Sequence, residues 1–156
     1  MDLKNMAILV VISMLLFGAV SAQKTVNEFQ IDGSYNNAYD GTYCSLYLNG
    51  NQDSGITVYK EFGDDDNESY DGLIHDEGKD YLTSDDDFKL DKNSDNTVSF
   101  TDYDHAEHGV AEVIDCGGEN FIVVFWAKDT SDVSNSDLVS QLNEFNKDNN
   151  VNAIAF

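Results

Sequence analysis

The sequence contains no arginine and no proline, and its only basic side chains are 8 lysines against 30 aspartates and glutamates. The formal net charge is −22. Nucleic-acid binding is disfavoured, because phosphate contacts need basic patches and bidentate reading of bases relies on arginine. An anionic membrane surface would repel the chain for the same reason. The acidic excess is typical of a solvated surface in an extracellular or salty medium, and it also attracts cations and basic partners.

Cysteine is also scarce, with 2 residues, Cys44 and Cys116. An even number of cysteines in an exported protein is typical of a disulfide, which would contribute about 4 kcal/mol here through loop entropy. The alternative is two separate buried thiols in an organism that lives without oxygen. The chain has no C-x-x-C pair, which argues against redox catalysis and against a cysteine-rich zinc site.

The long hydrophobic run of the chain lies at its N-terminus. A short charged lead with Lys4 precedes the apolar stretch 6–20, and Ser21 and Ala22 then offer the small residues that signal peptidase recognises. The run is shorter than the roughly 20 residues of a membrane-spanning helix. Residues 1–22 are therefore predicted to be a signal peptide, cleaved before Gln23. Residues 23–156 are then a single acidic domain, secreted, with no membrane contact after cleavage and with an extracellular or cell-surface partner.

Short alternating apolar runs predict a β-rich domain. The run 121–127 is apolar throughout, which favours a central strand buried on both faces. Spacing from Tyr70 to Tyr81 is near that of a helix, although Gly72 and Gly78 weaken this interpretation. Two hairpins are expected, at Asn49-Gly50 and at 115–120. The expected strands are 25–31, 42–48, 55–62, 88–90, 97–103, 109–114 and 121–127.

The C-terminal part predicts one amphipathic helix. Ser134 or Ser136 can cap it, and Leu138, Leu142 and Phe145 form an apolar stripe. Residues 151–156 can return as a last strand. The fold class is thus α+β, an antiparallel β-sheet covered on one face by a C-terminal amphipathic helix. This order of elements resembles small secreted sandwiches of the PsbP and DcrB type and uncharacterised exported proteins of methanogenic archaea. The resemblance implies a domain without enzymatic activity.

The segment 91–102 carries oxygen-bearing side chains at alternating positions and resembles an EF-hand or dockerin-type calcium loop. Asn96 stands where such loops have glycine, and Asp102 is one methylene shorter than the usual glutamate. The flanking residues are typical of strands rather than helices, so a polar hairpin turn is the alternative. The resemblance implies a Ca²⁺ site formed by Asp91, Asn93, Asp95, Thr97 through its carbonyl, Ser99 and Asp102.

Other groups admit a chemical and a structural interpretation. His105 and His108 lie among acidic residues, as in metal sites, but they are also typical of a surface loop. The acid runs 64–66 and 85–87 are typical of solvated loops. Trp126 and the tyrosines could form a carbohydrate-stacking platform. The apolar neighbours of Trp126 in the sequence instead favour a place for this residue in the core.

The expected function is therefore an exported, acidic binding or interaction module whose ligand the sequence does not identify. Divalent cations would order the loop 91–102 rather than take part in a reaction. The alternative is a secreted hydrolase that uses clustered carboxylates between Asp85 and Asp104, because glycoside hydrolysis needs two carboxyl groups held at a fixed separation.

Overall fold

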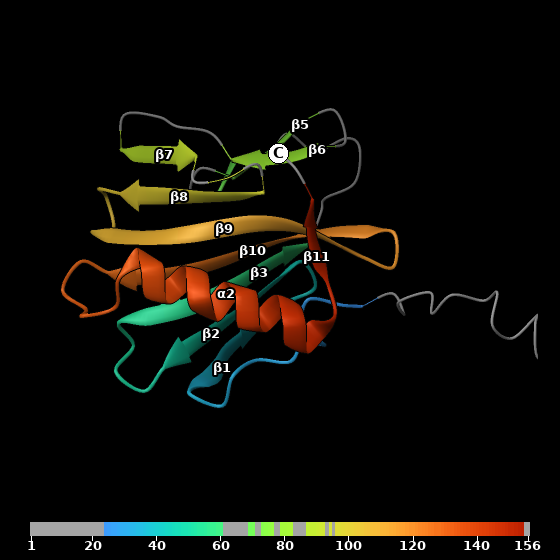
Figure 1. Cartoon of the computed structure of the whole chain (residues 1–156), viewed down its shortest axis with the longest axis horizontal. Helices are drawn as coiled ribbons and strands as arrows, with labels where there is room; N and C mark the ends of the chain where they lie inside the picture. Colours follow the sequence, from blue (N-terminus) through green and yellow to red (C-terminus); the bar gives the residue numbers. More distant parts are fainter. Residues whose placement is uncertain are drawn as a thin grey trace, which may run out of the picture.

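A main antiparallel sheet with one helix across it dominates the computed structural model (Figure 1). The structure describes residues 24–60, 69–70, 73–76, 79–82, 87–92, 94 and 96–154. Predictions for the signal peptide and for the acid run 64–66 lie outside these residues. The elements are β1 (Tyr35–Asp40), β2 (Cys44–Asn49), β3 (Ser54–Lys60), β4 (Ser69–Tyr70), β5 (Leu73–Asp76), β6 (Lys79–Leu82), β7 (Phe88–Lys92), β8 (Thr97–Asp102), β9 (Glu107–Cys116), β10 (Glu119–Lys128), α2 (Asn135–Asn149) and β11 (Asn152–Ile154).

The main sheet has 8 strands in the order β1-β2-β3-β10-β9-β8-β7, and β11 pairs with β9 beside β8. All of these pairs are antiparallel. The long hairpin β9–β10 therefore forms the centre of the sheet. Strands β4, β5 and β6 form a separate 3-stranded sheet. The predicted class, an antiparallel sheet with one C-terminal helix, is confirmed at this level.

Local signals set the ends of α2. The Ser134 hydroxyl accepts a hydrogen bond from the Asp137 backbone N–H at 3.3 Å, and the Asp137 carboxylate accepts one from the Ser134 N–H at 2.9 Å. This reciprocal capping box satisfies N–H groups that have no partner within the helix. Asn150 closes the other end in the left-handed region, with φ of 52°. The predicted cap at Ser134 is confirmed.

The core lies between α2 and the face of the sheet that α2 covers, called here the helix face. Leu138, Leu142 and Phe145 of α2 are buried in it, as the stripe predicted. Phe145 packs edge-on against Phe125 of β10, with ring centroids 5.9 Å apart. Because the stripe recurs every three or four residues, one side of α2 meets alternate residues of β9 and β10.

The prediction of a first strand at 25–31 is wrong. This segment is irregular, although Val26 and Phe29 are buried in the core. The side chain of Asn149 satisfies the backbone of Gln30 as a neighbouring strand would, accepting from its N–H at 2.7 Å and donating to its carbonyl at 2.9 Å. The Ser45 hydroxyl donates to the Val26 carbonyl at 2.6 Å. Side chains far away in the sequence thus replace ladder hydrogen bonds.

The prediction of a helix near residues 70–81 is also wrong, because the described residues of this segment lie in β4, β5 and β6. Leu73 pairs with Leu82 and Ile74 with Tyr81 across the β5–β6 hairpin. Gly72 and Gly78 divide the segment into pieces too short for a stable helix, and each glycine costs about 1 kcal/mol inside one. The helical spacing of the apolar residues was coincidental.

A carboxylate is buried on the helix face. Glu112 of β9 has only 4% of its surface exposed. Its oxygens accept hydrogen bonds from the Thr97 hydroxyl and from the Asn146 side-chain amide, both at 2.6 Å. Glu112 therefore joins β8, β9 and the last turns of α2, because a buried carboxylate is tolerated only with such donors.

We expect Glu112→Gln to lower the free energy of unfolding by about 1–3 kcal/mol, because one carboxylate acceptor becomes an NH₂ group and leaves a buried donor unsatisfied. Glu144→Gln, an exposed site on α2, is the matched control and should change stability by less than about 0.5 kcal/mol. Urea unfolding measures both. Equal midpoints for the two variants would contradict the proposed role of Glu112.

Candidate functional site: a pocket on the second face of the sheet

A pocket of about 540 Å³ lies on the face of the main sheet opposite α2, called here the second face. Side chains alternate between the two faces along each strand. On β10, Phe121, Val123 and Phe125 enter the core, and the intervening residues line the pocket. The lining residues are Tyr39, Cys44, Leu46, Thr57, Tyr59, Phe88, Phe100, Asp102, Glu107, Ala111, Ile122, Val124 and Trp126.

The second face is concave. Tyr39 lies on β1 and Phe88 on β7, the two ends of the strand order, yet both line this pocket. Seven flat strands would separate these edges by about 29 Å at a spacing of roughly 4.8 Å. A flat sheet has no walls that could enclose one pocket bordered by both of these edges, so the sheet curls around it.

A β-bulge directs Tyr39 into the pocket. In β1, Asn37 pairs with Tyr47, but the next pair is Tyr39 with Leu46, so one extra residue is inserted. Tyr35 precedes the bulge and lies on the helix face, where its hydroxyl donates to Gln141 of α2 at 2.7 Å. Without the extra residue, Tyr39 would share that face. Bulges often redirect side chains and bend strands next to binding sites.

Two glycines make room for aromatic rings on the second face. Gly55 pairs with Trp126, and Gly109 pairs with Phe100. A Cβ atom at either glycine would overlap the ring of its partner. The indole N–H of Trp126 also donates to the Thr57 hydroxyl at 3.2 Å, which fixes the ring. Aromatic rings lying over glycines are known to stabilise curved sheets.

The prediction that the run 121–127 is buried on both faces is confirmed on the second face for Ile122, which is 1% exposed and packs with Val113, but not for the other two residues of the run on that face. Val124 and Trp126 are half-buried and line the pocket. The expectation that Trp126 belongs to the core is corrected in the same way. Its ring lines the pocket, and a carbohydrate-stacking role stays a prediction.

One end of the pocket is acidic. Asp102 and Glu107 are direct cross-strand partners at the end of the β8–β9 hairpin, and both line the pocket. Asp102 is 7% exposed. Its two oxygens accept from the backbone N–H of His105 at 3.0 Å and from its ring Nδ1 at 2.8 Å. These bonds fix the orientation of the Asp102 carboxylate.

The segment of the predicted calcium loop forms the β7–β8 hairpin in the described residues. Asp91 pairs with Ser99, whose hydroxyl donates to the Asp91 carbonyl at 3.1 Å. Thr97 lies against Glu112 on the helix face, whereas Asp102 lies on the second face. Within the described part of the chain, no three His, Cys, Asp or Glu residues could together hold a metal. Asn93 and Asp95 lie outside that part, so the Ca²⁺ site stays a prediction.

The two cysteines lie on opposite faces of the sheet and are not joined in a disulfide. Cys44 lines the pocket, whereas Cys116 belongs to the core on the helix face. Of the two alternatives, the structure has separate thiols. Burial raises the pKa of both thiols above that of an exposed cysteine.

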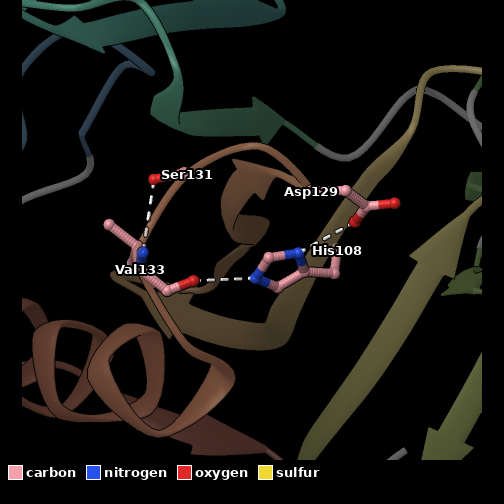
Figure 2. A network of polar contacts seen from close by, with 4 residues as sticks. All are labelled: His108, Asp129, Ser131 and Val133. Carbon is pink, nitrogen blue, oxygen red and sulfur yellow. Dashed lines mark hydrogen bonds and ion pairs between the residues drawn. The ribbon is translucent and has the colours of Figure 1, made fainter.

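The histidines do not act as a pair. Figure 2 shows His108 of β9 between Asp129 and Val133. These two partners lie in the connection that leads from β10 to α2. Its Nε2 donates to the Val133 carbonyl at 2.9 Å, and its Nδ1 lies 3.2 Å from the Asp129 carboxylate. His108 thus holds this connection against the hairpin, whereas His105 orients Asp102. The third histidine, His75, lies on β5, and its side chain is not among those that the structure describes.

Comparisons with protein-family models, with the curated proteins and with the solved structures found no match to this chain. The helix that the structure describes is not long and apolar enough to cross a membrane. The geometry of the second face is therefore the basis for interpreting this protein's function.

We expect the unfolded, unreduced protein to titrate 2 thiols, because the cysteines are on opposite faces. In the folded protein, only Cys44 should react with iodoacetamide. At pH values where an exposed cysteine already reacts at its maximal rate, the reaction rate of Cys44 should still increase with pH. The reason is that burial raises the pKa of this thiol and only the thiolate reacts. Cys44→Ser should abolish the native reaction. The absence of titratable thiols after unfolding would indicate a disulfide and contradict this result.

Proposed function

We propose that this protein is an exported, non-enzymatic binding module that holds a small, largely apolar ligand in the pocket on the second face. The observation that carries the proposal is the lining, in which 9 of the 13 side chains are aromatic or aliphatic. A volume of about 540 Å³ lies within the range of small-molecule sites, which are mostly apolar with a few oriented polar groups.

The composition of the second face supports a binding role. An antiparallel sheet with one packed face has polar residues on its other face when that face only meets water. Here the second face presents Leu46, Val124 and Trp126, all half-buried. A concave apolar surface of this kind is typical of a ligand site.

The arrangement of the carboxylates favours binding over the alternative, a hydrolase. Glycosidases need two carboxyl groups about 5–9.5 Å apart, on either side of the bond to be cleaved. Asp102 and Glu107 both come from a single hairpin at one end of the pocket, so they lie on one side of a ligand there rather than on either side of a bond. Both oxygens of Asp102 also accept hydrogen bonds from His105.

Export rests on the apolar run before Ala22 and on the acidic composition of the remaining chain. We expect the mature protein to begin at Gln23 and to be recovered outside the cytoplasm. N-terminal sequencing of the native protein measures this, and finding Met1 or Asp2 in the mature protein would contradict export by cleavage.

Ligand binding can be tested with dansylamide, a neutral fluorescent molecule. Trp126 is the only tryptophan in the chain and lines the pocket, so energy transfer from its indole to the dye reports binding, and the variants locate the bound dye. We expect saturable energy transfer in the parent protein. Val124→Phe should lower the affinity for dansylamide at least about fivefold, because the larger ring occupies the pocket.

The matched control is Val139→Phe, the same substitution at a half-buried position of α2 on the helix face. It should leave dansylamide affinity within twofold of the parent. Absence of saturable transfer, or an equal loss in both variants, would rule out the pocket as the binding site.

A further inference from the structure

The charged groups of the pocket are all of one sign. Among its described lining residues, Asp102 and Glu107 are the two that are charged at neutral pH, and no lysine lines it. The rest of the lining is aromatic, aliphatic or neutral polar. We infer that the pocket selects organic cations, meaning an amine or quaternary ammonium group attached to an apolar body. This inference rests on the proposed binding function and specifies its ligand class.

The two carboxylates are close together. Asp102 and Glu107 occupy directly opposed positions on β8 and β9, which places their Cβ atoms about 5 Å apart. Each carboxylate has a basic neighbour outside the pocket lining, because the His105 ring contacts Asp102 at 2.8 Å and Lys128 is the cross-strand partner of Glu107 on β10. A bound cation would approach the two carboxylates from the pocket, where the described lining contains no basic residue. Asp102 is buried and Glu107 half-buried, so solvent ions screen a cation placed beside them less than at an open surface.

Aromatic rings adjoin the acidic end. Phe88 is the cross-strand partner of Asp102 on its other side, and it stacks on Phe100 with ring centroids 5.1 Å apart. Aromatic faces attract ammonium groups through their quadrupole, most strongly where water is excluded. A cation at this end would therefore contact a ring and two carboxylates together, while its apolar body lies towards Leu46 and Val124.

The whole-protein charge acts in the same direction. A net charge of −22 raises the local concentration of cations and lowers that of anions around a concave surface of the same sign. An apolar anion would meet this repulsion without a basic lining residue to offset it among those described. Charge sign, more than shape, should thus discriminate between ligands of similar size.

The experiment compares two ligands that share a benzene ring and differ in charge. Benzyltrimethylammonium and benzenesulfonate compete with dansylamide for the parent protein, with energy transfer from Trp126 as the measurement. We expect the cation to displace the dye at a concentration at least about tenfold lower than the anion. Raising sodium chloride to about molar concentration should weaken binding of the cation but not binding of the neutral dye.

Glu107→Gln removes one charge with little change of shape. We expect it to raise the cation concentration for half-displacement about fivefold relative to the concentration of benzenesulfonate measured in the same variant. Glu144→Gln removes the same charge from α2, on the helix face, and should leave both values unchanged. Far-ultraviolet circular dichroism checks that both variants fold, and the salt titration of the parent provides a test that needs no variant.

The outcomes separate the two proposals. Dye binding with equal displacement by cation and anion, or equal effects of Glu107→Gln and Glu144→Gln, would overturn cation selectivity and leave the binding function standing. A parent protein that binds neither dye nor cation would overturn the binding function itself. Selective loss of the cation in Glu107→Gln would support both.

Discussion

One constraint shapes this protein: in the described part of the chain, one helix covers one face of a sheet that is apolar on both faces. The side chains of β10 alternate between a core sealed by α2 and a second face where Val124 and Trp126 stay half-buried. A flat sheet would leave this second face open to water at a cost of roughly 25 cal/mol per Å² of apolar surface. Curling of the sheet lets Tyr39 of β1 and Phe88 of β7 border one pocket, so the pocket follows from this constraint.

The curvature depends on small residues. Gly55 and Gly109 accept the rings of Trp126 and Phe100, and side chains at these positions would push the aromatic rings away from the strands. The bulge in β1 then directs Tyr39 over the same face. The stability of the sheet and the shape of the pocket are thus linked, because the rings that lie over these glycines also line the pocket.

The parts of the fold that follow from local signals could be predicted from the sequence. The capping box at Ser134, the stripe from Leu138 to Phe145 and the β9–β10 hairpin each depend on residues within a few positions of one another. The 25–31 segment could not be predicted, because its conformation depends on a side chain 119 residues away, Asn149. Its apolar alternation is equally compatible with a strand and with an irregular segment anchored by two buried residues.

The pocket lay beyond sequence analysis for a related physical reason. Its composition depends on register, since shifting a strand by one residue exchanges its two faces. The bulge that redirects Tyr39 has no marker such as glycine at the inserted position, and the pairing of Gly55 with Trp126 joins residues far apart in the chain. The acidic residues of 91–102 therefore suggested a site within one loop, whereas Asp102 faces the pocket together with Glu107. A carboxylate next to a turn gains its chemical context from the strands on either side of it, which is why the role of Asp102 emerged only from the three-dimensional arrangement.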